Sequence, residues 1–203
     1  MAPKRPYLVG IGGGTASGKS TLARKLTEAL SDLSVLVIGM DKYFKAEKPL
    51  HHAPLSGREW PDYNSPDSFH LGSLTGDLDA LLGGDGADTA SPPPDVVVVE
   101  GLMTLQHAPL RERLDLRVFV DAPADERIVR RLRRNMADRG LSFDEIADFY
   151  LQSVRFRHEE FVEQTRWYAD VVVNGVTMPE RGVELLAQHV RLAVGGTRIC
   201  SQS

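Results

Sequence analysis

Residues 13–20 are the feature of this sequence that most restricts its fold. They read Gly-Gly-Thr-Ala-Ser-Gly-Lys-Ser and match the pattern G-x-x-x-x-G-K-[ST]. A short apolar run, 7–11, precedes this loop, and Ser20 to Leu30 follow it with apolar residues at helical spacing. A strand, a glycine-rich loop and a helix in this order predict a site for a phosphate chain, because loop amides and a helix N-terminus attract anions. The alternative interpretation is a glycine-rich turn that matches by chance.

The loop pattern also assigns roles to its side chains. Lys19 is expected to reach the β- and γ-phosphates of ATP, and the Ser20 hydroxyl is expected to bind Mg²⁺. The predicted cofactors are therefore ATP and Mg²⁺. The residues expected to surround the phosphates are Gly13, Gly14, Thr15, Ala16, Ser17, Gly18, Lys19, Ser20 and Thr21.

Composition limits the class of protein. A chain of 203 residues, 42% of them hydrophobic, fits one domain over 1–203 with a small lid. A formal net charge of −4 does not indicate a nucleic-acid partner. The first residues do not resemble a signal peptide, and the longest apolar run, 96–99, is too short to cross a bilayer. We therefore expect no membrane association and a cytoplasmic location. The single cysteine, Cys200, excludes a disulfide within the chain.

Alternating strand and helix patterns predict the fold class. Continuous apolar strands suit a sheet covered on both faces, and their alternation with helices implies parallel strands joined by right-handed crossovers. The predicted fold is α/β, a three-layer α/β/α P-loop fold with a mainly parallel sheet and a helical lid. The strand candidates are 7–11, 34–39, 95–99, 116–120 and 170–174. The helix candidates are 18–31, 67–82, 123–139, 142–165 and 179–194.

Three segments interrupt this alternation. Residues 45–66 are rich in proline, histidine and aromatic side chains, and we expect an ordered loop there. Residues 83–94 contain Gly-Gly-Asp-Gly and Pro-Pro-Pro, which predict a surface connector. Residues 195–203 are expected to fray at the end of the chain.

Two acidic residues follow predicted strands. Asp41 comes just after the second strand, and it would lie beside the phosphate loop if that strand neighbours the first. There it could accept a proton from an attacking hydroxyl or hold Mg²⁺ through water, although a capping or turn aspartate also fits the position. Glu100 ends an apolar strand and is predicted to join Ser20 in the Mg²⁺ shell or to orient water. An ordinary strand-end acid is the alternative for Glu100.

An arginine cluster lies in the helix predicted for 123–139. Transfer of a phosphoryl group concentrates negative charge, which a lid that carries arginines can neutralise while it excludes water. A solvated basic face is the alternative, and we expect a mixture in which Arg131, Arg134 and Arg139 touch phosphate. The arginines of the cluster are Arg127, Arg130, Arg131, Arg133, Arg134 and Arg139.

The segment around His158 is expected to be a solvated helix.

Aromatic and acidic residues interleave in the proline-containing segment 60–69. Such a loop could stack on a flat group and hydrogen-bond sugar hydroxyls. Equally, Tyr63 and Phe69 could belong to the core, and Asp67 or Ser68 could cap the following helix. The residues alone support the two interpretations to a similar degree.

Taken in order, these segments resemble the uridine kinase family, within the wider group that includes phosphoribulokinase and bacterial pantothenate kinase. The resemblance covers about 7–176, which is most of the chain. The similar segments are residues 12–21 (the family's G-G-S-x-S-G-K-T-T), 41–45 (D-S-F-Y-K), 63–69 (N-F-D-H-P-D-A-F), 100–101 (E-G), 130–140 (R-R-I-x-R-D-x-x-E-R-G), and 150 with 158–173 (closing helix and last strand).

The resemblance implies roles for particular residues. It implies a lid at about 127–145, an acceptor-side loop at about 42–70, and Asp41 as the catalytic base, with Lys19 and Arg134 as further catalytic residues. Arg131 and Arg139 are implied at ATP. The implied partners are a nucleoside triphosphate and a small-molecule acceptor, and a homo-oligomer is compatible with the family. The implied acceptor-binding residues are Tyr43, Tyr63, Asn64, Asp67 and Phe149.

The sequence departs from the family pattern on the acceptor side. The family's ribose-binding Asp is Asn64, its lid Asp is Asn135, its final lid Arg is Leu141, and its pyrimidine-reading Gln is Phe149. The Tyr and His that precede the family's E-G strand end have no match in 83–94. The predicted function is ATP-dependent phosphoryl transfer to a nucleoside hydroxyl, of uridine or cytidine type.

Two alternatives remain open. One is a kinase for nicotinamide riboside, a sugar phosphate or a pantothenate-like alcohol. The other is a catalytically silent nucleotide-binding protein. A GTPase is disfavoured, because the sequence contains no N-K-x-D guanine motif.

Overall fold

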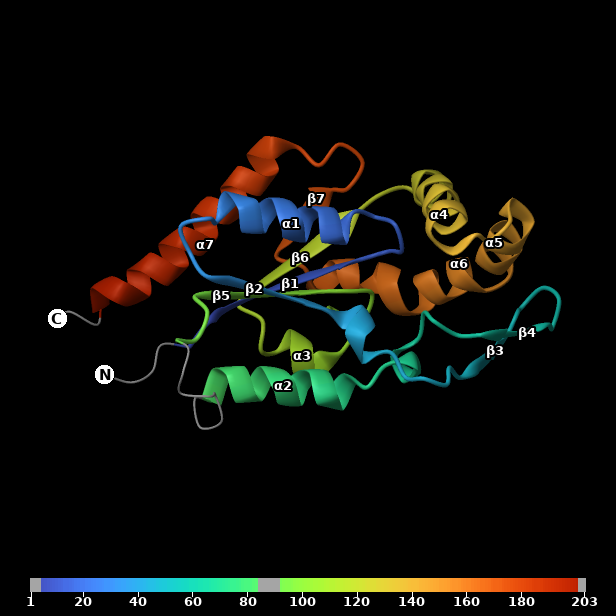
Figure 1. Cartoon of the computed structure of the whole chain (residues 1–203), viewed down its shortest axis with the longest axis horizontal. Coiled ribbons are helices and arrows are strands. Elements are labelled where there is room, and N and C mark those ends of the chain that lie inside the picture. The colour runs from blue at the N-terminus through green and yellow to red at the C-terminus, as the bar shows by residue number, and fades with distance from the viewer. Residues whose placement is uncertain (1–4, 84–91, 201–203) are drawn as a thin grey trace.

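A five-stranded parallel sheet forms the centre of the computed structural model, which describes residues 5–83 and 92–200, with side chains up to 195. The strand order is β2-β5-β1-β6-β7, and all four neighbouring pairs are parallel. Parallel neighbours require crossover connections, so helices lie on both faces of the sheet (Figure 1). The strands are β1 (Tyr7–Gly13), β2 (Val35–Gly39), β5 (Val96–Glu100), β6 (Leu116–Asp121) and β7 (Val171–Asn174).

Each face of the sheet has its own hydrophobic core. Val9 and Ile11 of β1 point to the face covered by α1 and α7, whereas Leu8 points to the face covered by α2 and α3. The four valines of β5 are fully buried, as a strand covered on both sides requires. This arrangement confirms the predicted three-layer α/β/α architecture. The covering helices are α1 (Lys19–Ala29), α2 (Leu71–Gly83), α3 (Ala108–Arg111) and α7 (Glu180–Cys200).

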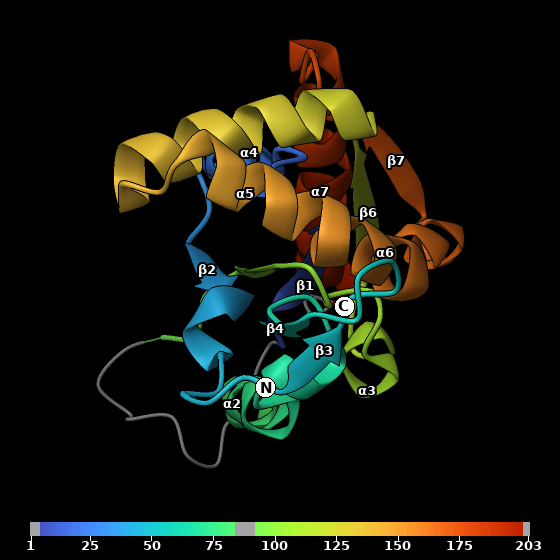
Figure 2. The ribbon, with the colours of Figure 1, turned by 90° about the vertical axis from the view of Figure 1, so that its right-hand side faces the viewer.

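The carboxyl ends of the strands meet at the end of the molecule that carries α4, α5 and a small hairpin. Figure 2 shows α4 and α5 on one side of this end and the hairpin on the other. The loop after β1 and the turn after β2 both open toward this end, as ligand sites in parallel sheets usually do. The elements here are β3 (Leu50–His52), β4 (Glu59–Pro61), α4 (Ala124–Arg139) and α5 (Phe143–Phe149).

The helix predicted for 142–165 is broken into several short segments. Buried side chains recur every four residues along it, at Ile146, Tyr150, Val154, His158 and Val162, and Ser153 and Thr165 are buried as well. That spacing exceeds the 3.6 residues of an α-helical turn, so a regular α-helix would rotate these positions away from the core. The wider turns of π-helix keep them on the buried face. The segments after α5 are π-helical Tyr150–Val154, α6 (Arg155–Arg157), π-helical His158–Val162 and 3₁₀-helical Glu163–Tyr168.

Other expectations were wrong at element ends and in loops. Residues 45–66, expected to be a loop, contain the antiparallel hairpin β3–β4, whose three-residue strands are too short to give a periodic pattern. The helix predicted from 67 begins at Leu71, because Pro66–Ser68 form a 3₁₀ turn. The C-terminal segment expected to fray is helical up to Cys200, and 201–203 lie outside the described residues. The predicted connector also lies largely outside them, over 84–91.

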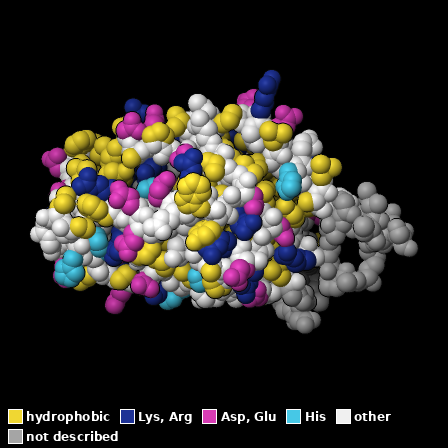
Figure 3. Space-filling model, turned by 180° about the vertical axis from the view of Figure 1, so that it is seen from behind, with side chains coloured by type: hydrophobic (Ala, Val, Ile, Leu, Met, Phe, Trp, Pro, Cys, Tyr) yellow, Lys and Arg dark blue, Asp and Glu magenta, His cyan; other side chains and the backbone are white. Residues whose placement is uncertain are grey.

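The surface mixes charges of both signs. Figure 3 shows acidic and basic side chains interspersed over the face opposite to that of Figure 1. Among the residues that the structure describes, none of the helices has the length and apolar character needed to span a membrane.

Candidate active site

The turn between β1 and α1 has a backbone suited to an anion. Gly13 has a φ of 139°, and a Cβ atom there would lie 2.5 Å from the carbonyl oxygen of Val120, so glycine is required. Ala16 also adopts a positive φ, of 57°. Helix α1 begins at Lys19, and the first amides of a helix have no partners within it. The turn therefore offers the N–H groups of a helix N-terminus where the sequence predicts a phosphate chain.

Lys19 lies inside this turn. Its Nζ donates a hydrogen bond to the carbonyl oxygen of Gly14 at 2.8 Å. Burial lowers the pKa of Lys19 to about 8, while the negative charges of Glu100 and Asp41 act in the opposite direction. A phosphate chain would add further negative charge beside Nζ and so favour its protonated form.

Ser20 and Glu100 meet at the base of the loop. Strands β1 and β5 are neighbours, and the Ser20 hydroxyl donates to Oε1 of Glu100 at 2.9 Å. A hydroxyl and a carboxylate oxygen are donors that Mg²⁺ selects, and phosphates and water usually complete its shell. The pair therefore fits the predicted metal role. Within the described ranges no cluster of three or more His, Cys, Asp or Glu side chains could hold a metal by itself.

Asp41 lies at the same end of the sheet, but the order of the strands differs from the one expected. Strand β2 does not neighbour β1, because β5 lies between them, and Gly39 pairs with Glu100. Asp41 comes two residues after β2 and is exposed, and it lines the larger of two clefts. Its charge raises the pKa of Lys19, so the two side chains are electrostatic neighbours across the site.

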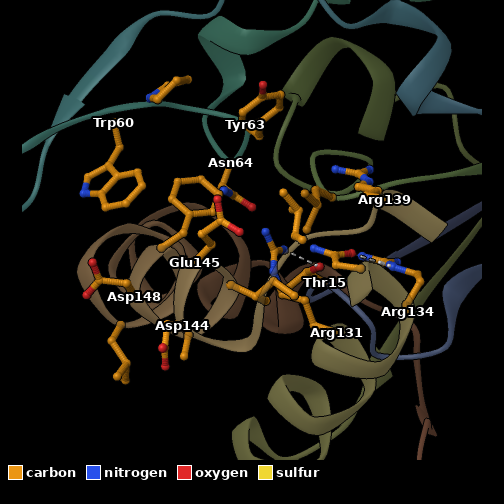
Figure 4. Close-up of a pocket in the computed structure, with 18 of the residues that line it drawn as sticks. Thr15, Trp60, Tyr63, Asn64, Arg131, Arg134, Arg139, Asp144, Glu145 and Asp148 are labelled. Carbon is orange, nitrogen blue, oxygen red and sulfur yellow. Dashed lines mark hydrogen bonds between the residues drawn. The ribbon is translucent and has the colours of Figure 1, made fainter. Parts of the chain in front are cut away.

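The larger cleft, of about 750 Å³, lies between α4–α5 and the segment around the hairpin. In Figure 4, Trp60, Tyr63 and Asn64 face the cleft from one side, and the arginines of α4 approach from the other. Thr15 of the phosphate loop forms part of its wall. The predicted site residues that line it are Thr15, Asp41, Tyr63, Asn64, Arg131, Arg134, Arg139 and Phe149.

A second cleft, of about 520 Å³, lies on the other side of the loop. The loop 174–178 after β7 forms its far wall, and Arg130 fixes that wall by donating to the carbonyl oxygens of Gly175 at 2.8 Å and Val176 at 3.1 Å. Arg134 lines both clefts. The predicted ATP residues in this lining are Ala16, Gly18, Lys19, Ser20 and Thr21. Gly13, Gly14 and Ser17 are buried in the loop and line neither cleft.

One wall of the larger cleft is aromatic. The rings of Trp60 and Phe149 lie 5.3 Å apart between centroids, and Tyr63 meets Phe149 edge-on at 6.3 Å. We call these three residues the aromatic cluster. The Arg58 guanidinium stacks 4.0 Å above the Trp60 ring and pairs with Asp148 at 3.5 Å. These contacts join the hairpin to α5.

Asn64 presents a polar group within this wall. It is 4% exposed, and its backbone N–H donates to Oδ1 of Asp62 at 2.8 Å, which fixes the turn. Its side-chain Nδ2 has no hydrogen-bond partner among the described residues. A buried donor without a partner is costly, so a bound molecule with an acceptor atom would satisfy it.

Two predicted acceptor-binding residues lie elsewhere. The Tyr43 hydroxyl donates to Asp77 at 2.7 Å, and burial together with this bond raises the pKa of Tyr43 to about 12. Asp67 is exposed in the 3₁₀ turn, whereas Ser68 beside it is buried. Neither Tyr43 nor Asp67 lines the larger cleft. Tyr43 and Asp67 lie in two different turns, and their positions in the sequence could not show which side of each turn faces the cleft.

Sequence reasoning missed two residues packed against the phosphate loop. Arg127 and His158 are 5% and 8% exposed, and a Cβ atom on Gly14 would lie 2.8 Å from Arg127 Nη1 and 2.9 Å from His158 Cε1. His158 Nε2 also lies 2.9 Å from a carboxylate oxygen of Glu163. The expectation of a solvated segment at His158 was therefore wrong. The buried positions around His158 recur every four residues, and this spacing indicates a buried face only when the turns are known to be π-helical.

We expect substitution of Gly14 by alanine to weaken nucleotide binding. The added methyl group would collide with Arg127 and His158, and overpacking of this kind typically costs about 1–3 kcal/mol, or roughly 5- to 150-fold in an equilibrium constant. Calorimetric titration with a non-hydrolysable ATP analogue measures the effect. Gly76→Ala in α2 is the control, because nothing lies within 4 Å of its added Cβ. Unchanged affinity in Gly14→Ala would mean that the loop accommodates the methyl group freely.

His158 should make stability depend on pH. Burial lowers the pKa of His158 to about 4, Arg127 acts in the same direction, and Glu163 opposes them. As the pH falls, the His158 imidazole is therefore protonated in the unfolded chain at a higher pH than in the folded protein. The free energy of unfolding that this difference contributes is present above pH 6.5 and is lost progressively toward pH 4, by at most about 3 kcal/mol. Urea unfolding of the wild type and of His158→Gln across this range measures the difference, with His70→Gln, at an exposed position, as control. Equal pH dependence in the wild type and His158→Gln would contradict this account.

These features define an α/β phosphate-loop protein whose two clefts meet at an arginine-bearing helix. The model of the Phosphoribulokinase / Uridine kinase family matches residues 85–182. Uridine kinase of Deinococcus deserti is 36% identical over 94% of this chain and 98% of its own length. Uridine kinase of Geobacillus kaustophilus is 35% identical over 94% of this chain and 93% of its own. The chain belongs to the phosphoribulokinase / uridine kinase family.

A solved structure supports the fold independently. A candidate fructose transport system kinase from Silicibacter sp. TM1040 matches with a TM-score of 0.60 at 22% identity. The match covers 84% of this chain and 91% of that one. At this level of identity the likeness concerns the fold alone.

Proposed function

We propose that this protein is an ATP-dependent nucleoside kinase that transfers the γ-phosphoryl group of ATP to a hydroxyl of a uridine- or cytidine-type nucleoside. The observation that supports it most strongly is the convergence of three parts in one cleft: the phosphate loop at Thr15, the exposed carboxylate of Asp41, and Arg134 of α4. A kinase needs a donor site, a base for the acceptor hydroxyl and a cation for the developing charge. The relatives named uridine kinase support the same reaction class.

In this proposal the donor side holds the phosphates. The loop amides and Lys19 bind the β- and γ-phosphates, and the second cleft takes the nucleoside part beside Gly175 and Val176. Ser20 and Glu100 would hold Mg²⁺, which neutralises phosphate charge and orients the oxygens when it is bound.

The acceptor side carries out the proton transfer. Asp41 takes the proton of the acceptor hydroxyl while the hydroxyl oxygen attacks the γ-phosphorus of ATP. The bond between the γ-phosphorus and the oxygen of the leaving ADP breaks. Arg134, which lines both clefts, stabilises the charge on the transferring group. The remaining lid arginines at this cleft, Arg131 and Arg139, add positive potential.

The walls of the larger cleft favour a nucleoside over a phosphorylated sugar. The aromatic cluster offers ring faces to a flat base. Arg58, the one lining arginine outside α4 among the described residues, is already paired with Asp148. Asp144 and Glu145 also line this cleft, and their charge would repel an anionic acceptor.

A coupled assay of ADP release tests this proposal. The purified protein with ATP and Mg²⁺ is offered uridine, cytidine, nicotinamide riboside, a sugar phosphate or pantothenate. We expect release that depends on uridine or cytidine. Release with another acceptor alone would replace the proposed substrate. Slow release that no acceptor stimulates would favour the catalytically silent nucleotide-binding protein.

The proposal keeps several expectations that follow from the family. They are a single domain over 1–203 with a lid at about 127–145 and an acceptor-side loop at about 42–70, a cytoplasmic location, and a homo-oligomer as a compatible state. Size-exclusion chromatography with light scattering measures the oligomeric state directly.

A further inference from the structure

Phe149 lines the larger cleft and contacts both the aromatic wall and an arginine of α4. Its ring contacts Trp60 and Tyr63 at the centroid distances given above. The guanidinium carbon of Arg131 also lies 5.6 Å from the centroid of this ring, within the range of a cation–π interaction. One ring therefore touches both the wall proposed for the base and an arginine of the lid.

Arg131 continues this contact to the phosphate loop. Its Nη1 donates to Oγ1 of Thr15 at 3.0 Å, the dashed line between these two labelled residues in Figure 4. Both residues are 8% exposed, so neither side chain moves without disturbing its packing. The Nε atom of Arg131 has no hydrogen-bond partner among the described residues. The Thr15 hydroxyl and the Phe149 ring are therefore two of the contacts that set the position of this guanidinium.

We propose that Phe149 is a positioning residue that couples occupancy of the acceptor pocket to the state of the phosphate loop, through Arg131 and Thr15. An acceptor that packs against the aromatic cluster fixes the Phe149 ring. The ring then holds Arg131 against Thr15, and the loop stays in the form that receives the phosphates. A side chain such as glutamine at this position would offer no ring face to the guanidinium. This inference takes one assumption from the proposed function, namely that the acceptor binds against the aromatic cluster.

A first experiment needs no acceptor. The chain has two tryptophans, and Trp167 is 88% exposed, so a Trp167→Phe protein reports on Trp60 alone. Because Trp60 contacts Phe149, we expect a non-hydrolysable ATP analogue to change Trp60 emission when it binds at the loop. Thr15→Val keeps a branched side chain but removes the hydroxyl that accepts from Arg131, and it should abolish most of this change. Thr15→Ser should preserve it. A full change in Thr15→Val, or none in the parent protein, would overturn the proposal.

A second experiment measures the coupling itself. Calorimetry gives the dissociation constant of the ATP analogue with and without saturating uridine. Coupling between two sites is typically about 5- to 150-fold, and we expect the wild type to bind the analogue at least about fivefold more tightly with uridine present. Phe149→Leu should reduce this factor to within about twofold of unity. Phe143→Leu is the matched control, because Phe143 begins the same helix and is 56% exposed.

The double variant Phe149→Leu/Thr15→Val distinguishes one connected path from two independent effects. Both changes interrupt the same chain of contacts, so the double variant should lose no more coupling than Phe149→Leu alone. Independent, additive losses would contradict the path. Failure of the wild type to bind uridine would overturn the proposed acceptor, whereas the tryptophan experiment would still decide the role of Phe149 and Thr15.

Discussion

Replacing Asp41 by asparagine should remove most turnover and leave nucleotide binding largely intact. Asparagine keeps the shape of the side chain but cannot take the proton of an acceptor hydroxyl. General acid–base groups typically contribute about 10²–10⁴-fold, and we expect kcat to fall within that range. Asp41 lines the acceptor cleft and not the cleft formed by Lys19 and Thr21, so affinity for an ATP analogue should change by less than about threefold.

The control for this prediction is Asp138→Asn. Asp138 is an exposed aspartate of α4 that lines neither cleft, so the kcat of Asp138→Asn should match that of the wild type. Steady-state kinetics and calorimetric titration measure the two quantities separately. Unchanged kcat in Asp41→Asn would move the base to another carboxylate of the cleft, with Asp144 and Glu145 as the candidates.

Replacing Arg134 by alanine should lower kcat more than it lowers nucleotide affinity. Arg134 lines both clefts and so lies along the path of the transferring group. A cation that acts on charge developing in the transition state stabilises that state more than it stabilises bound ATP. Loss of one such donor typically costs about 10²–10³-fold in kcat.

Arg133→Ala provides the matched comparison. Arg133 is the preceding residue in α4, is exposed, and lines neither cleft, so a general loss of positive charge from the helix would affect both variants. We expect Arg133→Ala to keep near wild-type kcat. A rise in KM for ATP at constant kcat in Arg134→Ala would contradict a role in the transition state.

The sequence was sufficient for the parts of the site that depend on local pattern. Lys19 and Ser20 follow from the loop motif, because backbone geometry within a few residues fixes where they lie. Glu100 ends a continuous apolar strand, and such a strand has to be covered on both faces of the sheet. The structure places this strand next to β1. The position of Asp41 after the second strand placed it correctly at the carboxyl end of the sheet. That prediction assumed that the second strand neighbours the first, whereas β5 lies between them.

Features that depend on tertiary packing could not be predicted. Tyr43 and Asp67 match a family pattern, but packing decides where each side chain lies: the Tyr43 hydroxyl bonds Asp77 of α2, and Asp67 is exposed. His158 and Arg127 reach the phosphate loop only because distant segments fold against it, and their charge suggested an exposed surface. The unusual four-residue spacing of buried positions around His158 became meaningful once the π-helical turns were seen.

A crystal structure with a non-hydrolysable ATP analogue and Mg²⁺ tests the central claim most directly. We predict that the β- and γ-phosphates lie within hydrogen-bond distance of the loop amides of residues 14–20 and of Lys19 Nζ, with the terminal phosphate facing the Asp41 carboxylate. A phosphate chain bound elsewhere, with the loop empty or with Asp41 turned into bulk solvent, would contradict the account.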